Sequence, residues 1–360
     1  MAGSLEKIPV NVVTGFLGSG KTTLLQRVLQ TPEFADTAVL INELGEVGLD
    51  HHLLEEIDEN ILLLQNGCVC CTIRSDLKDA IRDLHSRRSR GLVPPFRRLV
   101  IETTGLADPT PILATIALEP VIHNHFRLGN VIVTVDALNA LLLMARQPES
   151  LKQIAVADRI ILTKTDLAAL PQIEAVKTRL RRLNPSAPLI ETGDKPVDPA
   201  FLLAHDLHDS SYLPNEVRRW QEVESHDGDT IVGGVRSQNH QDLHDTHRHD
   251  NRIAAFALTF DEPMDWTAFG IWLTMLLQSH GEDVLRVKGM LNVAGVGTPV
   301  VIHGVQHIVH PPVHMTRWPD EDRRSRIVFI VRDIAREEIE RSLMAFNRVA
   351  RDYKPQSHAA

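Results

Sequence analysis

The chain has 360 residues, of which 43% are hydrophobic and 24% are charged, and its formal net charge is -9. This length exceeds what one hydrophobic core usually supports, so we expect two domains. The acidic balance argues against a general nucleic-acid binder, which usually presents a basic face.

The N-terminus leads directly into a strand-like run, without the cationic and apolar segments of a secretory signal. No apolar run reaches the roughly 20 residues that a membrane-spanning helix needs. We therefore expect a cytoplasmic protein, in a compartment where thiols stay reduced and clustered cysteines indicate metal binding or catalysis.

Apolar, β-branched runs alternate with helical patterns in the first part of the chain. A run at 10–14 is followed by a glycine-rich turn and by a helical stretch that starts at Lys21. Further strand-like runs lie at 38–42, 61–65, 99–103, 131–136 and 159–163. Unbroken apolar strands between helices predict an α/β domain, with a mainly parallel sheet covered by helices on both faces.

The segment GFLGSGKT at 15–22 fits the phosphate-loop pattern G-x-x-x-x-G-K-[ST] and lies between a predicted strand and a predicted helix. In such a loop, glycines let backbone amides approach phosphate oxygens. Lys21 would reach the terminal phosphates and Thr22 would ligate magnesium. The predicted nucleotide-binding residues of this loop are Gly15, Gly18, Ser19, Gly20, Lys21, Thr22 and Thr23.

The segment LTKTDL at 162–167 resembles the Asn-Lys-x-Asp guanine reader of GTPases, with Thr163 in place of Asn. Asp166 could accept two hydrogen bonds from the guanine edge, and the stem of Lys164 could cover the ring. A turn with a helix cap is the alternative interpretation, but the phosphate loop upstream favours guanine reading. The stretch 184–192 is our candidate for the loop that closes over the base.

The segment ETTGLADP at 102–109 begins at the end of a predicted strand. We expect Glu102 to support magnesium or its water, and the backbone amide of Gly105 to sense the γ-phosphate. Together with Lys21, these are the predicted catalytic residues. A helix cap or an ion pair is the alternative for Glu102, and the flanking Thr-Thr-Gly favours the functional interpretation.

All 3 cysteines of the chain, Cys68, Cys70 and Cys71, lie within four consecutive positions. In an extended strand Cys68 and Cys70 would share a face and Cys71 would point away, so a turn is needed for all three to hold one ion. Three thiols also fall short of the four ligands of a closed zinc site. Either ligands from elsewhere complete the site or one position stays open, and the candidates for completing it are Glu43 and Glu46.

A polar, His-rich stretch at 223–251 predicts a flexible linker, which either captures metal ions or serves as a simple tether. A smaller α+β domain is predicted after it. Its expected elements are strands at 253–260, 284–293, 299–310 and 326–331, a helix at 265–281 capped by Asp265, and a last helix from about Asp333. We therefore divide the chain into 1–222, 223–251 and 252–360.

The segments GFLGSGKTTLL, NELGEVGLD, NGCVCC, ETTGLADP and TKTD, in this order, resemble the CobW family of metal-handling P-loop GTPases. LRVKGMLNVAG, HGVQH and RIVFIVR extend the resemblance to the second domain. It implies GTP and magnesium at the phosphate loop, and delivery of metal to a client metalloprotein or chelatase. The implied zinc or cobalt ligands are Cys68, Cys70 and Cys71, with Glu43 or Glu46 as helpers.

Our hypothesis is a GTPase with slow intrinsic turnover, whose metal affinity depends on the bound nucleotide. The alternatives are a passive Cys and His metal buffer, an activator or insertase dedicated to a cobalt enzyme or to cobalamin synthesis, and a small-molecule kinase. The guanine-reading segment argues against the kinase. We expect no nucleic-acid or membrane partner, and a nucleotide- or metal-dependent homodimer stays an open alternative.

Overall fold

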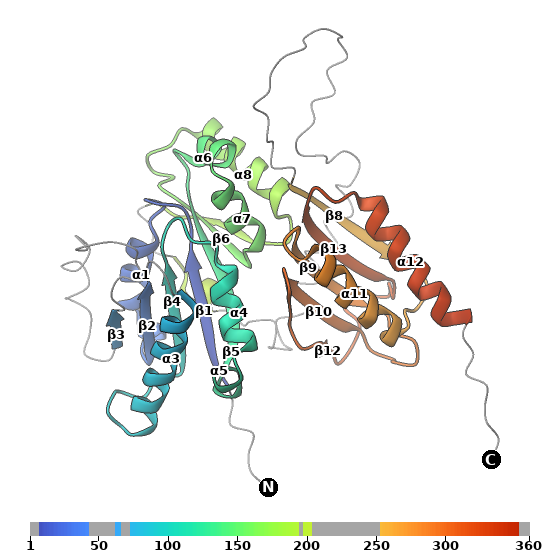
Figure 1. Cartoon of the computed structure of the whole chain (residues 1–360). Coiled ribbons are helices and arrows are strands. Elements are labelled where there is room, and N and C mark those ends of the chain that lie inside the picture. The colour runs from blue at the N-terminus through green and yellow to red at the C-terminus, as the bar shows by residue number, and fades with distance from the viewer. Residues whose placement is uncertain (1–6, 43–61, 66–72, 194–196, 204–252, 353–360) are drawn as a thin grey trace. The chain divides into compact units, whose positions relative to one another are not determined.

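The computed structural model describes residues 7–42, 62–65, 73–193, 197–203 and 253–352. The chain divides into two compact units (Figure 1): residues 7–180 and 187–203 belong to the first, and residues 181–186 and 253–352 belong to the second. The domain limits that we predict at 222 and 251 therefore lie outside the described residues and stay a prediction. Among the helices of the described ranges, none is long and apolar enough to cross a membrane.

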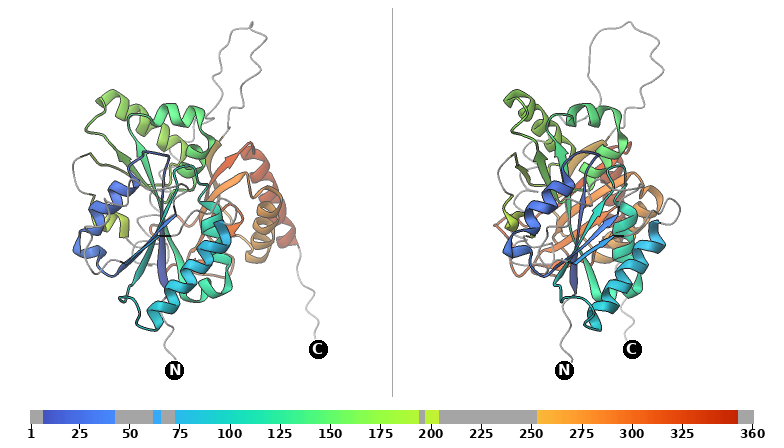
Figure 2. Two further views of the ribbon diagram at one scale, coloured as in Figure 1. Left: turned by 60° about the vertical axis from the view of Figure 1, so that its left-hand side comes forward. Right: turned by 90° about the vertical axis from the view of Figure 1, so that its left-hand side faces the viewer.

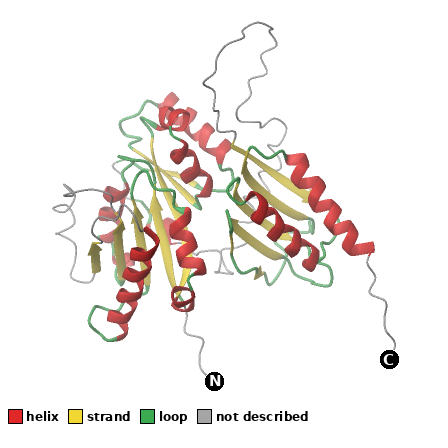
Figure 3. Ribbon diagram, in the orientation of Figure 1, coloured by secondary structure: helices red, strands yellow, loops and turns green. Residues whose placement is uncertain are grey.

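A seven-stranded sheet forms the centre of the first unit, in the order β3-β2-β4-β1-β5-β6-β7. Figure 3 draws its strands in yellow. Neighbouring strands in this order pair in parallel. The strands are β1 (Ile8–Thr14), β2 (Thr37–Asn42), β3 (Leu62–Gln65), β4 (Arg98–Thr103), β5 (Phe126–Asp136), β6 (Arg159–Thr163) and β7 (Leu189–Glu191). The predicted α/β class with a parallel sheet is confirmed.

Helices connect these strands and lie on either side of the sheet (Figure 2). They are α1 (Lys21–Leu29), the 3-10 turn η1 (Pro32–Phe34), α3 (Ile73–Ser89), α4 (Thr110–Leu118), α5 (Pro120–His125), α6 (Ala140–Arg146), α7 (Pro148–Val156), α8 (Leu170–Leu183) and α9 (Pro199–Leu203).

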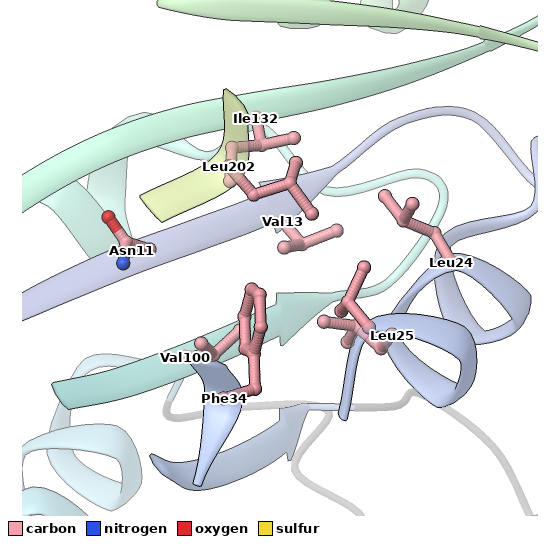
Figure 4. A pocket seen from close by; sticks show the side chains of 9 residues that line it. Asn11, Val13, Leu24, Leu25, Phe34, Val100, Ile132 and Leu202 are labelled. Carbon is pink, nitrogen blue, oxygen red and sulfur yellow. The ribbon is translucent and has the colours of Figure 1, made fainter. Parts of the chain in front are cut away.

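Both faces of the sheet are buried, because successive residues of β5 pack against helices on opposite faces. On one face, Ile132 packs with Leu25 of α1 and Leu202 of α9 in one hydrophobic core (Figure 4). On the other face, Val133 and Ile154 of α7 line a cavity of about 10 Å³. Burial on both faces explains why the strands read as continuous apolar runs.

The second unit contains a six-stranded antiparallel sheet in the order β11-β10-β9-β13-β8, and β12 pairs with β10. Trp272 of one helix and Ile339 of another share a core with Phe329, so both helices pack on the same face. The elements are β8 (Ile253–Phe260), α11 (Trp266–His280), β9 (Val284–Leu291), β10 (Val300–Val305), β11 (Ile308–Val309), β12 (Val313–His314), β13 (Ser325–Arg332) and α12 (Arg336–Asp352). The predicted α+β class of this unit is confirmed.

Element boundaries follow the sequence patterns closely, with differences that have local causes. The Asp265 side chain accepts a hydrogen bond from the Ala268 N–H at 2.8 Å, which is the predicted cap of α11. The last helix begins at Arg336 rather than near Asp333, because Asp333 has a φ of 55°, which a right-handed helix cannot include. Strand β7 is absent from the prediction, since its partly exposed residues carry no alternating pattern.

Candidate functional site

The turn between β1 and α1 has the backbone geometry of a phosphate loop. Its three glycines, Gly15, Gly18 and Gly20, have φ values of 143°, 69° and 91°, which glycine adopts without strain. Lys21 is the first residue of α1, and its Nζ donates to the carbonyl oxygens of Gly15 at 2.9 Å and Phe16 at 3.2 Å. Lysine, glycine turn and helix N-terminus thus meet in one place, and this combination binds phosphate.

Thr22 and Glu102 meet beside this loop, although 80 positions separate them in the sequence. The Thr22 hydroxyl donates to Glu102 Oε1 at 2.7 Å, and Glu102 is 2% exposed. A hydroxyl and a carboxylate are hard oxygen ligands, which magnesium prefers. The donor set therefore fits a magnesium ion that these two residues and the nucleotide phosphates would share.

The loop after β4 packs directly on the phosphate loop. The Thr103 hydroxyl donates to Thr14 Oγ1 at 2.7 Å, which ties the ends of β4 and β1 together. Gly105 lies so close to Leu17 that a methyl group on Gly105 would be 2.5 Å from the Leu17 nitrogen. Only glycine fits this approach, and the close approach places the Gly105 backbone beside the phosphate loop, where we predict a γ-phosphate contact.

Lys164 follows β6 in a left-handed conformation, with a φ of 57°, and is held by a buried carboxylate. Its Nζ lies 2.8 Å from Asp136 Oδ2, and Asp136 is 4% exposed. Burial alone raises the pKa of Asp136, but hydrogen bonds from Lys164, Asn139 and the Leu138 N–H outweigh it and lower the pKa below its usual value. Asp136 was not among the predicted site residues, and it stays ionised to fix the Lys164 side chain.

Thr163 joins the turn after β6 to the phosphate loop. Its hydroxyl donates to the Ser19 carbonyl at 2.8 Å and to the Val135 carbonyl at 3.2 Å. The Ser19 hydroxyl in turn lies 2.6 Å from Thr134 Oγ1, so Ser19 is fixed from two strands. In the sequence, Thr163 is only a departure from the Asn-Lys-x-Asp pattern, whereas in the structure its hydroxyl connects two loops.

Asp166 is exposed next to the chain that leaves β7. Gly193 lies against it, since a methyl group on Gly193 would be 2.8 Å from Asp166 Oδ1. The Arg27 guanidinium donates to the Gly193 carbonyl at 2.9 Å, and the Thr192 N–H donates to Leu162 O at 2.8 Å. The end of the stretch 184–192 therefore reaches the side of Asp166. Thr23 is exposed in the first turn of α1.

The predicted metal ligands, Cys68, Cys70, Cys71, Glu43 and Glu46, lie outside the described residues. The strands that lead to them are described, and they are parallel neighbours: Ile41 pairs with Gln65 of β3 and with Glu102 of β4. Parallel strands end at the same edge of a sheet. The segment with Glu43 and Glu46 therefore follows the strand next to β4, and the segment with the cysteines follows the strand beyond it, at the same edge of the sheet as Glu102. The described ranges contain no group of three or more His, Cys, Asp or Glu side chains that could hold a metal ion.

A glycine-rich phosphate loop, a Thr and Glu pair beside it and a Lys-x-Asp turn on a parallel sheet define a P-loop GTPase fold. The model of the CobW/HypB/UreG nucleotide-binding domain matches residues 9–191. The model of the cobalamin synthesis protein cobW C-terminal domain matches residues 253–347. The chain therefore belongs to the CobW family, and the resemblance stated from its motifs is confirmed.

Individual relatives match over nearly their full length. A protein named zinc chaperone YjiA, from Escherichia coli (strain K12), is 33% identical over 335 residues, which are 93% of this chain and 97% of the relative. Zinc-regulated GTPase metalloprotein activator 1 of Schizosaccharomyces pombe is 28% identical over 357 residues, covering 92% and 84% of the two chains. A crystal structure of Zn(II)-bound YjiA GTPase from E. coli has a TM-score of 0.67 at 30% identity, and covers 95% of this chain and 99% of that chain.

Proposed function

We propose that the chain is a GTP-hydrolysing metallochaperone, which binds zinc or cobalt in a nucleotide-dependent way and transfers it to a client metalloprotein or chelatase. The observation that carries the proposal is the register of β2, in which Ile41 pairs with both Glu102 and Gln65. The nucleotide site and the two predicted ligand segments therefore share one edge of one sheet. Relatives that are named zinc chaperones and zinc-regulated GTPase activators support the same function.

GTP would place its phosphates in the turn 15–22, where Lys21 neutralises negative charge that is spread over the γ-phosphoryl oxygens during transfer. Water attacks the γ-phosphorus while the bond to the β–γ bridging oxygen breaks, which yields GDP and phosphate. Magnesium, held by Thr22 and supported by Glu102, would supply further charge neutralisation. The Gly105 amide would donate to the γ-phosphate and would lose this contact after hydrolysis.

Guanine would lie between the Lys164 stem and the chain after β7. Asp166 would accept hydrogen bonds from the two guanine N–H groups, which adenine does not present in this arrangement. The buried contact of Asp136 with Lys164 keeps the lysine stem from leaving this position. These contacts favour GTP as the nucleotide.

The metal cargo would bind to Cys68, Cys70 and Cys71, with Glu43 or Glu46 completing its coordination. Thiolates favour zinc and cobalt over magnesium and calcium. Because the segment with the two glutamates follows β2 next to Glu102, a change at the γ-phosphate can alter metal affinity. Linkage then requires the bound metal to change GTP affinity by the same factor.

Competitive zinc titrations with a non-hydrolysable GTP analogue and with GDP, both in the presence of magnesium, test this proposal. We expect zinc affinity to differ between the two nucleotides by about 5-fold to 150-fold, which is the usual range of coupling between two sites. Lys21→Ala should remove the difference and leave zinc binding by the thiols in place. Cys70→Ser should weaken zinc binding while GTP affinity without zinc stays unchanged. Equal zinc affinities in both nucleotide states would contradict the proposal and favour a passive buffer.

A further inference from the structure

A glutamine on α7 contacts the loop that carries Gly105. Gln153 is 1% exposed, and its side-chain Nε2 donates to the carbonyl oxygens of Gly105 at 3.2 Å and Ala107 at 3.0 Å. The same loop is closed by a hydrogen bond from the Ala107 N–H to the Thr104 carbonyl at 3.1 Å. One amide group therefore fixes two peptide units of a short turn. This turn includes the residue that we expect to meet the γ-phosphate.

The loop contacts both α7 and the phosphate loop. Gln153 binds it from α7, and Leu17 of the phosphate loop leaves Gly105 no room for even a methyl group. Gln153 also lines the cavity of about 10 Å³ that Phe16 and Ser19 of the phosphate loop line. The side chain thus lies near both the phosphate loop and the loop after β4, and the peptide unit that follows Gly105 cannot rotate without losing the hydrogen bond from Gln153.

Gln153 is an unusual residue for its position. Its neighbours on α7, Leu151 and Ile154, are 5% and 1% exposed and pack as ordinary core side chains. Burying a side-chain amide costs free energy unless it makes hydrogen bonds, and an apolar side chain would fill the same volume at no such cost. The described hydrogen bonds of Gln153 are donated to carbonyls of the Gly105 loop. The amide N–H group therefore stabilises that loop and is not needed for the packing of α7.

A second contact from α7 reaches the same loop at its end. Lys152 Nζ lies 3.4 Å from Asp108 Oδ2, and the two side chains are 30% and 32% exposed. A partly exposed ion pair of this kind contributes little by itself. Removal of this ion pair is therefore a control. It shows how far a nonspecific weakening of the loop's contacts changes nucleotide affinity.

We propose that Gln153 is a positioning residue for GTP hydrolysis, which holds the peptide unit after Gly105 and so fixes the turn from which the Gly105 N–H meets the γ-phosphate. This inference rests on the proposed GTPase function and assigns to α7 a part in distinguishing GTP from GDP. Gln153 does not touch the nucleotide in this scheme. It acts through the Gly105 and Ala107 carbonyls, so its removal should affect contacts to the γ-phosphate and spare those to the base and the other phosphates.

The test compares Gln153→Met with the wild-type full chain. Methionine keeps the length of the side chain and removes the donor. We measure dissociation constants for a non-hydrolysable GTP analogue and for GDP with magnesium, and the single-turnover rate of GTP hydrolysis. Two neutral hydrogen bonds are lost, so we expect the affinity ratio of GTP analogue to GDP to fall about tenfold, with GDP affinity unchanged and hydrolysis slower.

Gln172→Met is a matched control, because Gln172 makes the same kind of contact elsewhere. Its Nε2 donates to the carbonyls of Ala137 at 3.2 Å and Leu138 at 2.8 Å, on the base side of the sheet. Its loss should change both nucleotide affinities equally or neither. Lys152→Met should leave the affinity ratio within about twofold, because the exposed ion pair is weak.

The outcomes are distinct. An unchanged affinity ratio in Gln153→Met, or an equal loss for both nucleotides, overturns the inference. If Gln153→Met does not fold, Gln153→Asn keeps the amide but cannot reach both carbonyls, and it should lower the ratio in the same direction. A wild-type chain that neither prefers guanine nucleotides nor hydrolyses GTP would instead contradict the proposed function, before any variant is compared.

Discussion

Gly105→Ala is the substitution whose effect the structure determines most directly. The added methyl carbon would lie 2.5 Å from the Leu17 nitrogen, 2.6 Å from its Cα and 2.7 Å from its Cδ2. Non-bonded carbon atoms in contact are about 3.5–4.0 Å apart, so the two loops must separate by about 1 Å. Two of the three contacts are to backbone atoms, which a side-chain rotation cannot relieve.

A displacement of that size breaks the hydrogen bond that we propose between the Gly105 amide and the γ-phosphate. Hydrogen bonds to charged groups contribute about 1.5–3 kcal/mol, which corresponds to about 10-fold to 150-fold in affinity. We therefore expect Gly105→Ala to lower the affinity for a GTP analogue by that factor and to leave GDP affinity nearly unchanged. Overpacking should also lower the free energy of unfolding by about 1–3 kcal/mol.

Isothermal titration calorimetry of both nucleotides with magnesium, together with urea unfolding, measures these effects. Gly270→Ala is the control, because a methyl group at Gly270 on α11 meets no atom within 4 Å. This control should raise the free energy of unfolding by about 0.5–1 kcal/mol through its helix propensity, without any change in nucleotide affinity. Equal affinities of Gly105→Ala and the wild-type chain for the GTP analogue would refute the reasoning.

Two further predictions concern the base and the pH dependence of stability. Asp166→Asn should shift the preference from guanosine toward xanthosine nucleotides, because the amide donates where the carboxylate accepted; competition between GTP and XTP measures this, and an unchanged preference would remove Asp166 from base reading. His85 stacks on His125 with ring centroids 4.0 Å apart, and burial, the His125 charge and the Arg88 charge lower the pKa of His85. The folded state therefore binds this proton less readily than the unfolded state, so stability is retained above about pH 6.5 and decreases as the pH falls below it. Urea unfolding between about pH 7.5 and about pH 5.5 measures this effect. The free energy of unfolding should decrease less for His85→Gln than for the wild-type chain, and equal decreases would contradict the role of His85.

Local sequence patterns predict the elements of both units well, because each pattern reflects contacts between neighbouring residues. The apolar run at 159–163 matches β6, and Asp265 caps α11, because strand alternation and helix capping depend on a few adjacent positions. The phosphate loop was predictable for the same reason, since Gly15 to Thr22 carry its chemistry in one continuous segment.

Contacts between distant positions were not predictable in this way. Lys164 is separated from Asp136 by 28 positions, and Gln153 from Gly105 by 48. Neither Asp136 nor Gln153 belongs to a recognisable motif, and each acts because the parallel sheet brings its element beside the site. A burial pattern could have indicated Gln153, since a polar residue in an otherwise apolar helix face needs a partner.

The hydroxyl of Thr163 connects the turn after β6 to the phosphate loop through the Ser19 carbonyl. A protein that bound the turn 164–167 and moved it outward would pull on the Ser19 carbonyl through this bond. In the proposed GTPase, phosphate binding would then weaken, although the partner protein does not contact the phosphates. In the proposed GTPase, a partner that binds the exposed turn 164–167 would therefore accelerate nucleotide exchange.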